Sequence, residues 1–234
     1  MTAIDAQQRL LLEGCWEAMA HSTPGSGAGE ACNDARAVGV IVGISYNEYY
    51  LNSAHQGMSA YTATSGTLSV VCGRISFTLG LKGPSVSIDT ACSSSLVGAH
   101  LACTSFIPGG CYRSLAAGVN LTMRAETTAV LSKAGMLASD GRCKTLDAAA
   151  DGYMRGEACI VHLLEALAAS DGVAGSVLLP AAIIVGTAVN QDGRSSSLTA
   201  PNGPSQQAVV REALACNSVA ASDVSVLEMH GTGT

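Results

Sequence analysis

The chain has 234 residues, of which 48% are hydrophobic and only 13% are charged, and its formal net charge is −6 at pH 7. This length suffices for one sizeable α/β domain or two small ones, and the composition is that of a globular chain whose helices and strands are largely buried. The 12 lysines and arginines are scattered along the chain. That distribution argues against a nucleic-acid-binding protein, because neutralising phosphates requires a cluster of basic residues.

The sequence shows no recognisable targeting or membrane-spanning signal. Asp5 and Arg9 stand where a signal peptide needs an apolar core. The longest apolar run, residues 177–189, is interrupted by Pro180 and Gly186 and is too short to cross a bilayer. The nine cysteines are odd in number and include no CxxC pair, so we expect neither a disulfide framework nor a metal site. We therefore expect a soluble, reducing compartment, which is the cytoplasm or, with a targeting segment outside this sequence, the plastid stroma.

The hydrophobic pattern predicts helices and strands that alternate along the chain. A helix is expected at residues 6–20, followed by a short buried strand at 38–43 and a long helix at 59–81. The next strand, at 85–89, runs directly into a turn at Cys92 and then into a helix. Later strands are expected at 115–119, 159–163, 181–189 and 224–229, and a later helix at 205–215. Interleaved strands and helices favour a layered α/β fold.

Two polar, glycine-rich stretches are expected to form site loops, because irregular loops on a rigid scaffold often carry function. One is DGYMRGE at 151–157, where Gly152 and Gly156 allow tight turns. The other combines VNQDG at 189–193 with APNGP at 200–204.

Cys92 is the strongest candidate for a catalytic residue. A cysteine at the first turn of a helix lies near unpaired backbone N–H groups and the positive end of the helix dipole, and both favour the thiolate. The same N–H groups, including that of Cys92, can stabilise the oxyanion that forms when a thiolate attacks a thioester. The serines that follow Cys92 keep the turn small and polar and can cap exposed donors.

Several motifs carry a resemblance to a known family. The run DTACSSSL at 89–96, preceded by GPSV at 83–86, is similar to the active-site signature of ketosynthase (beta-ketoacyl synthase) domains of type I polyketide synthases. The same family is matched in the same order by DAQQRLLLE at 5–13, GRIS at 73–76, VNQDG at 189–193, APNGPSQ at 200–206 and HGTGT at 230–234. The resemblance implies the thiolase-like fold, an α/β fold with layers αβαβα in which two similar halves pack their sheets around a central helical layer.

The resemblance also implies how the chain is divided. Roughly residues 1–165 correspond to the N-terminal half of the fold, with the nucleophile, and roughly residues 166–234 to the start of the C-terminal half. The family's domain is longer at both ends, and its second catalytic histidine, a nearby lysine and a C-terminal glycine-rich turn have no counterpart in this sequence. We therefore expect a partial, truncated domain whose coding sequence continues, and a fragment that cannot condense substrates by itself.

In the chemistry that the resemblance implies, Cys92 accepts an acyl chain from the 4'-phosphopantetheine arm of an acyl carrier protein. A malonyl-type thioester then loses carbon dioxide, and its carbanion attacks the acyl-enzyme to give a 3-oxoacyl thioester. His230 matches one of two histidines that assist decarboxylation by hydrogen bonding to the enolate oxygen. Thr232 and Thr234 match positions that contact the pantetheine arm. The implied partners are the acyl carrier protein, its acyl and malonyl-type thioesters, and a second copy of the full domain in a homodimer. No directly bound cofactor is implied.

The other histidines are weaker candidates. His100 follows Cys92 by eight residues, which is roughly 12 Å along a helix and too far for direct proton transfer. His162 falls in an apolar strand and is expected to be a satisfied core residue. His21 and His55 fall in loops, where we expect them to be solvated.

Two alternatives to polyketide chain elongation remain open. A fatty-acid ketosynthase shares the chemistry, although the matches at 189–193 and 200–204 favour the polyketide type. A non-catalytic scaffold or dimerisation partner related to condensing enzymes belongs to a different class. Such partners usually lack the nucleophile, which Cys92 supplies in this chain.

Overall fold

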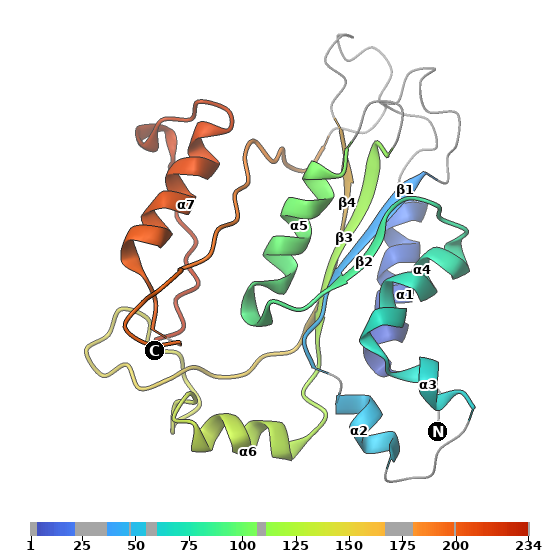
Figure 1. Cartoon of the computed structure of the whole chain (residues 1–234), viewed down its shortest axis with the longest axis horizontal. Coiled ribbons are helices and arrows are strands. Elements are labelled where there is room, and N and C mark those ends of the chain that lie inside the picture. Colours follow the sequence, from blue (N-terminus) through green and yellow to red (C-terminus); the bar gives the residue numbers. More distant parts are fainter. Residues whose placement is uncertain are drawn as a thin grey trace.

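A computed structural model describes residues 4–21, 37–46, 48–54, 60–106, 111–166, 180–198 and 200–233. Its centre is a four-stranded sheet with the strand order β2-β1-β3-β4. The strands are β1 (Val38–Gly43), β2 (Ser85–Ile88), β3 (Arg113–Asn120) and β4 (Ala158–Glu165). The first three are parallel, and β4 runs antiparallel to β3. The carboxyl ends of the parallel strands therefore lie together, at the lower end of the sheet in Figure 1.

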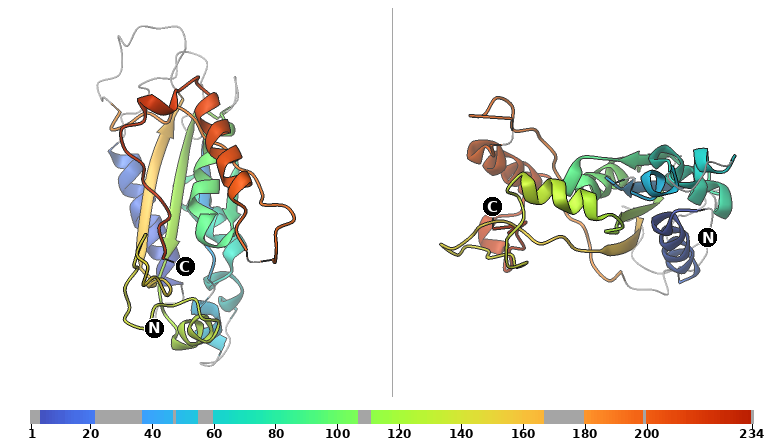
Figure 2. Two further views of the ribbon diagram at one scale, coloured as in Figure 1. Left: turned by 90° about the vertical axis from the view of Figure 1, so that its left-hand side faces the viewer. Right: turned by 90° about the horizontal axis from the view of Figure 1, so that it is seen from below.

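Helices cover both faces of the sheet (Figures 1 and 2). α1 (Ala6–Ala20) and α4 (Leu68–Leu79) lie on one face, and α5 (Ser94–Thr104) lies on the other. α7 (Gly203–Ala215) lies beyond α5 on the same side of the sheet. The layered α/β arrangement that the alternating pattern predicted is thus confirmed.

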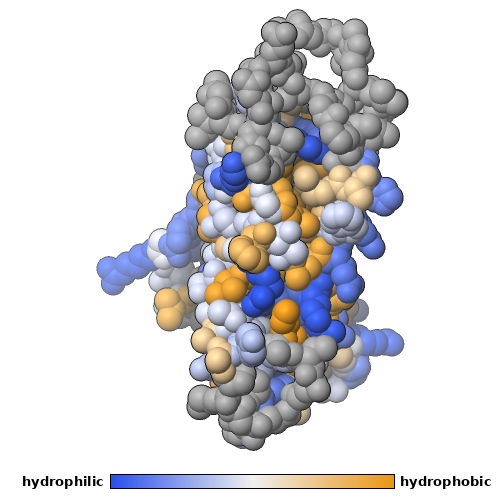
Figure 3. Space-filling model, turned by 90° about the vertical axis from the view of Figure 1, so that its right-hand side faces the viewer, coloured by the Kyte–Doolittle hydropathy of each residue, from blue (hydrophilic) through white to orange (hydrophobic). Residues whose placement is uncertain are grey.

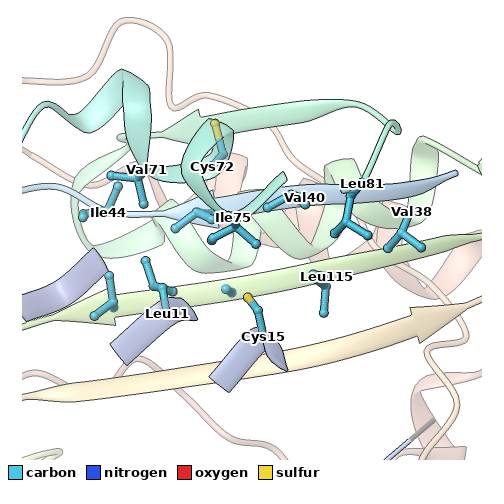
Figure 4. Close-up of a cluster of buried hydrophobic side chains, with 13 residues drawn as sticks. Leu11, Cys15, Val38, Val40, Ile44, Val71, Cys72, Ile75, Leu81 and Leu115 are labelled. Atoms are coloured by element: carbon cyan, nitrogen blue, oxygen red, sulfur yellow. The ribbon is translucent and has the colours of Figure 1, made fainter. Parts of the chain in front are cut away.

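β1 is the central strand of the core, and all six of its residues are buried. Val40 and Val42 face α1 and α4, where they share a cluster with Leu11 and Ile75 (Figure 4). Ile41 points the opposite way and packs in a second cluster under α5. Because successive strand residues point to opposite faces, a strand between two helical layers must be apolar throughout, as VGVIVG is.

The helix expected at 6–20 is present as α1, with the same bounds. Its N-cap residue, Asp5, accepts a hydrogen bond from the backbone N–H of Gln7 at 2.9 Å, which satisfies a donor that the helix itself leaves unpaired. Leu11 and Cys15, one turn apart, are fully buried. Burial raises the pKa of the Cys15 thiol to about 12, so this cysteine stays protonated and serves as core packing.

The prediction of a single helix at 59–81 is wrong. The chain forms α3 (Thr62–Ser65) and α4 as separate helices, and residue 59 itself lies outside the described ranges. Thr67, between the two, has an extended backbone with ψ of 125° and becomes the N-cap residue of α4. Continuous helical hydrogen bonds cannot pass such a residue. The apolar pattern nevertheless identified the buried face of α4 correctly.

The strands expected at 181–189 and 224–229 are not formed by the described residues of these segments. Both segments contain β-branched residues, but a strand also requires a neighbour that completes its hydrogen bonds. In the described part of the chain no strand pairs with either of them. Their side chains remain largely exposed, at 58% for Ile183 and 75% for Leu227.

The other expected elements are present with small differences at their ends. The strands expected at 85–89, 115–119 and 159–163 are confirmed as β2, β3 and β4, and the helix expected at 205–215 is confirmed as α7. Two short helices, α2 (Glu48–Ala54) and α6 (Ala125–Lys133), were not predicted from the sequence. No residue of α6 is buried, so α6 has no apolar face that could have revealed it.

The outer face formed by α1 and α4 carries apolar patches between polar ones (Figure 3). Trp16 of α1 and Phe77 of α4 are 64% and 88% exposed. Within the described ranges, no helix is both long and apolar enough to span a membrane.

Candidate active site

Cys92 lies where β2 leads into α5. The short 3₁₀ turn Ala91–Ser93 follows β2 and contains Cys92, and α5 begins directly afterwards at Ser94. The predicted order of strand, turn and helix is confirmed, with Cys92 two residues ahead of the α-helix. Its side chain is exposed. It lies at the end of the sheet where the parallel strands terminate, which is where open α/β sheets place their ligands.

Hydrogen bonds from several side chains hold the turn around Cys92. The Ser94 hydroxyl accepts from the backbone N–H of Thr90 at 2.8 Å and donates to the carbonyl of Ala91 at 2.7 Å. The Ser45 hydroxyl donates to the same carbonyl at 3.2 Å, and an Asp89 carboxylate oxygen accepts from the Ala91 N–H at 3.0 Å. Ala91 has a left-handed φ of 56°, a conformation that costs about 1–3 kcal/mol for a residue other than glycine. The surrounding bonds offset this cost. Ser93, the N-cap residue of α5, makes no side-chain cap hydrogen bond, so the capping expected of the serines is not observed at the start of this helix.

Two glycines allow the first turn of α5 to lie directly on the sheet. A Cβ atom at Gly43, the last residue of β1, would be 2.5 Å from the backbone nitrogen of Ser95. A Cβ atom at Gly118 of β3 would be 2.8 Å from the Cβ atom of Ser95. Both separations are shorter than side chains can adopt. The position of Cys92 above the strand ends therefore depends on the absence of side chains at these two residues.

Tyr153, in the predicted 151–157 loop, lies close enough to Cys92 for their charges to interact. Burial raises the pKa of the Tyr153 hydroxyl, and the neighbouring Tyr46 and Cys92 raise it further, while Arg155 acts in the opposite direction. The loop that was predicted to carry function therefore comes within electrostatic range of the candidate nucleophile. Tyr153 itself was not singled out by the sequence.

A buried ion pair, Glu48 with Arg155, lies at the same end of the sheet. Arg155 Nη2 is 3.1 Å from Glu48 Oε1, and the two side chains are only 6% and 2% exposed. Glu48 Oε2 accepts hydrogen bonds from the backbone N–H groups of Met123 at 2.6 Å and Arg124 at 2.7 Å. Arg155 Nη1 donates to the Thr128 hydroxyl at 2.8 Å. Both charged groups thus have several partners, as buried charges require.

The DAQQRLLLE motif near the N-terminus connects the segments that follow strands β1 and β3. Arg155 lies over the ring of Tyr46, 5.4 Å from its centroid, and the Tyr46 carbonyl accepts from Gln7 Nε2 at 3.2 Å. Gln7 Oε1 in turn accepts from the Leu121 N–H at 3.0 Å. This buried glutamine therefore bridges the segments that follow β1 and β3. Its neighbour Gln8 accepts from Arg74 Nε at 2.6 Å, which joins the DAQQRLLLE and GRIS motifs.

The buried ion pair predicts a dependence of stability on pH. Burial raises the pKa of Glu48, but hydrogen bonds from Thr127, Met123, Arg155 and Arg124 outweigh it and hold the pKa below its usual 4.5. A carboxylate whose pKa is lower in the folded state than in the unfolded state stabilises the folded protein. This stabilisation is complete at pH values above the unfolded-state pKa of the carboxylate, and it is lost as the pH falls through the folded-state pKa.

We expect Glu48→Gln to lower the free energy of unfolding at pH 7 by about 3–5 kcal/mol, because it leaves Arg155 buried without a counter-charge. Urea unfolding of both proteins between pH 7 and pH 3 measures the effect. The difference in the free energy of unfolding between the two proteins should shrink below pH 4.5, which is the usual pKa of a glutamate side chain. A difference that stays constant down to pH 3 would show that the carboxylate charge does not contribute.

The segment that carries His230 lies against the loop between α6 and β4. The Thr145 hydroxyl donates to the carbonyl of Gly231, and the N–H of Gly152 donates to the carbonyl of Gly233 at 3.1 Å. The side chain of His230 is exposed and Thr232 is half-buried, while Thr234 lies outside the described residues. This segment and the start of α5 lie toward the same end of the sheet (Figure 1). Loop residues 144–153 thus connect the His230 segment with the surroundings of Cys92.

The other histidines occupy varied environments. His100 Nδ1 is hydrogen-bonded to the Thr187 hydroxyl at 2.9 Å, which ties α5 to the segment before α7. The expectation that His162 is a core residue is wrong, because its side chain is exposed. β4 is the last strand in the sheet order, and its face toward α5 is left largely open by the described residues. His21 is exposed as expected, and His55 lies outside the described ranges.

The cysteines differ in accessibility. Cys92, Cys143 and Cys216 are exposed, whereas Cys111 is buried. Burial raises the pKa of the Cys103 thiol. The sequence did not indicate that Cys143 and Cys216 are accessible, so thiol reagents have more than one exposed target.

The sequence matches two family profiles, the N-terminal domain of beta-ketoacyl synthases over residues 1–170 and the C-terminal domain over residues 181–234. It is 45% identical over 234 residues to the pikromycin polyketide synthase component PikAII of Streptomyces venezuelae. It is 44% identical over 236 residues to a phenolphthiocerol/phthiocerol polyketide synthase of Mycobacterium tuberculosis. These alignments cover 99% of this chain but only 6% and 15% of the two relatives.

Solved ketosynthases have a similar fold. The oxazolomycin ketosynthase domain of Streptomyces albus matches with a TM-score of 0.84 and 34% identity. The ketosynthase from module 6 of the bacillaene synthase of Bacillus subtilis matches with a TM-score of 0.79 and 33% identity. Each match covers 99% of this chain, which spans 39% and 38% of those two chains. The thiolase-like α/β fold that the motifs implied is confirmed, and the chain belongs to the beta-ketoacyl synthase family.

Proposed function

We propose that the protein containing this chain is the ketosynthase of a type I polyketide synthase, which extends an acyl chain by decarboxylating condensation. The observation that carries this proposal is the position of Cys92. It is an exposed thiol on a turn held by hydrogen bonds, at the carboxyl ends of parallel strands. The named relatives and solved neighbours, which are polyketide synthases and ketosynthases, support the same reaction class.

In the first step, the Cys92 thiolate attacks the carbonyl carbon of an acyl thioester. A new carbon–sulfur bond forms, and the pantetheine sulfur leaves as a thiolate that takes up a proton. The backbone N–H of Cys92 is proposed to donate to the oxyanion of the tetrahedral intermediate, where charge stabilisation has its largest effect. The result is an acyl group on Cys92 and a free carrier thiol.

In the second step, a malonyl-type thioester loses carbon dioxide, and the electron pair of the broken carbon–carbon bond forms an enolate. The enolate carbon attacks the acyl-Cys92 carbonyl, and the Cys92 thiolate leaves. We propose that His230 donates a hydrogen bond to the enolate oxygen, and that Thr232 and Thr234 contact the pantetheine arm. The segment of His230 lies against the loop that contains Tyr153, which is within electrostatic range of Cys92, and this supports the assignment.

Partners follow from the same proposal. The substrates are acyl and malonyl-type thioesters on the phosphopantetheine of an acyl carrier protein. A homodimer of the full domain is supported by the exposed edge of the sheet, because in the described part of the chain β2 has a neighbouring strand on one side only. Open strand edges favour pairing with another chain. We place the boundary between the two halves of the fold near residue 166, close to the gap between the two family profiles.

The test uses the full-length polypeptide that contains this chain. It is incubated with an acyl pantetheine thioester, and the modified residue is located by mass spectrometry. We expect acylation at Cys92, with Cys143 and Cys216 unmodified even though both are exposed. Addition of a malonyl thioester should release carbon dioxide and form a 3-oxoacyl product.

Controls separate the proposed enzyme from the alternatives. Cys143→Ala should be acylated at Cys92 to the same extent as the wild-type protein. A non-catalytic scaffold predicts no acylation at all. Acylation of Cys103 or Cys111 with Cys92 untouched would require the nucleophile assignment to be withdrawn.

A further inference from the structure

The residues that follow β1 contact two parts of the candidate site that are far apart in the sequence. The Ser45 hydroxyl donates to the Ala91 carbonyl in the Cys92 turn. One residue later, the ring of Tyr46 lies under the guanidinium of Arg155, and Glu48 forms the buried ion pair with the same side chain. A single short segment therefore contacts both the nucleophile turn and the 151–157 loop.

The 151–157 loop, which contains Arg155, also contacts the segment that carries His230. Tyr153 forms two backbone hydrogen bonds with the residues that follow α6. Its N–H donates to the Met136 carbonyl and its carbonyl accepts from the Ala138 N–H, both at 3.0 Å. Gly152 then donates to the Gly233 carbonyl at 3.1 Å. Gly152 has a φ of 141°, and a Cβ atom there would be 2.5 Å from the Ala138 nitrogen, so the loop is closely packed at this point.

From these contacts we infer that Glu48 and Arg155 are positioning residues, whose buried ion pair fixes the 151–157 loop and the attached His230 segment relative to the Cys92 turn. The catalytic meaning of this inference rests on the proposed function. Glu48 and Arg155 act through the residues they hold, and neither has a role in bond formation.

General electrostatics supports a geometric role for this pair. Removing two charges from water is costly, and a buried ion pair often stabilises a fold no better than apolar residues of similar volume. What such a pair does supply is directional, charge-assisted hydrogen bonding. Glu48 uses both carboxylate oxygens, one toward Arg155 and one toward the backbone of residues 123 and 124, so it orients two loops at once.

The experiment compares three variants of the full-length polypeptide. Glu48→Gln removes the charge with little change in shape. Glu48→Gln combined with Arg155→Met removes both charges, so that no unpaired buried charge remains to unfold the protein. The matched control is Glu126→Gln, which makes the same chemical change in the ion pair of Arg124 and Glu126, where the carboxylate is 69% exposed and the two charged atoms are 3.0 Å apart.

The first readout does not depend on activity. It is the hydrogen-exchange rate of the Gly152 amide, whose N–H donates to Gly233. We expect exchange to be at least about tenfold faster in Glu48→Gln and in the double variant, because the loop opens more often. We expect no change in Glu126→Gln. Unchanged exchange in both Glu48 variants would overturn the inference.

The second readout separates the two half-reactions. In the double variant we expect acylation of Cys92 to stay within about threefold of the unmodified protein, while carbon dioxide release from malonyl thioester falls roughly 10-fold to 100-fold, as expected for a misplaced catalytic group. A melting temperature restored to that of the unmodified protein, together with normal carbon dioxide release, would show that the pair is only structural. If the unmodified protein neither acylates Cys92 nor releases carbon dioxide, the proposed function fails, and the exchange result alone decides the inference.

Discussion

Replacing Cys92 by alanine is expected to lower the rate of 3-oxoacyl thioester formation by at least about 10³-fold, because loss of a covalent nucleophile removes both chemical steps. No other cysteine can replace it, since none of the others lies in the turn between β2 and α5. The measurement is a steady-state condensation assay with the full-length polypeptide, in parallel with mass spectrometry of the acylated enzyme. Both signals should disappear in Cys92→Ala.

Two controls make this result specific. Cys216→Ala removes another exposed thiol and should keep the full rate. The unfolding midpoint of Cys92→Ala should match that of the unmodified protein, because an exposed side chain contributes little to stability. Retained condensation in Cys92→Ala would mean that the bond-forming residue lies elsewhere.

The second large effect is expected from Gly43→Ala. The added Cβ atom would be 2.5 Å from the Ser95 nitrogen and 2.6 Å from the carbonyl carbon of Ser94. Both are backbone atoms of the first turn of α5, so no side-chain rotation can relieve the clash. We expect the free energy of unfolding to fall by about 3 kcal/mol, the upper part of the usual range for overpacking. The acylation rate of Cys92 should fall about 10²-fold, because the turn must shift by a substantial fraction of an ångström.

The matched control is Gly73→Ala, the same substitution within α4. No atom lies within 4 Å of the Cβ position there. Alanine is favoured over glycine in a helix, so this variant should gain about 0.5–1 kcal/mol in stability and acylate at the normal rate. Urea unfolding and acylation kinetics of the two variants test the comparison. Equal stability of Gly43→Ala and the unmodified protein would show that α5 does not lie on the sheet as described.

Features determined by a single contiguous segment could be predicted from the sequence. α1 was placed correctly because its apolar spacing and its cap, Asp5, both lie within the helix and its flank. The strand, turn and helix around Cys92 are contiguous as well, so the local structure of the candidate nucleophile could be predicted without knowledge of distant contacts. The break before α4 was missed, because the expected helix was extended beyond the apolar residues of α4 and across Gly66 and Thr67, where the backbone is not helical.

Features that depend on distant partners were not predictable in this way. Glu48 and Arg155 are separated by 107 residues, and neither sequence environment indicates that the carboxylate is buried. The segments at 181–189 and 224–229 illustrate the opposite error. Their composition predicted strands, but strand formation depends on a neighbouring strand, and none pairs with them in the described part of the chain. His162 was misjudged for a related reason, since the exposure of a strand residue is decided by what covers its face of the sheet.

The close packing of α5 on Gly43 and Gly118 also affects how the sequence of such a protein can diverge during evolution. The thiol is located by contacts between main-chain atoms and small residues, so its coordinates are insensitive to the identity of the bulky side chains around it. Substitutions in the loops at the strand ends can reshape the approach to Cys92 while leaving the sulfur in place. Evolution can therefore alter the shape of this end of the sheet without moving the candidate nucleophile. Change would move the sulfur at the two glycines and at the residues whose side chains hold the turn, Ser45, Asp89 and Ser94.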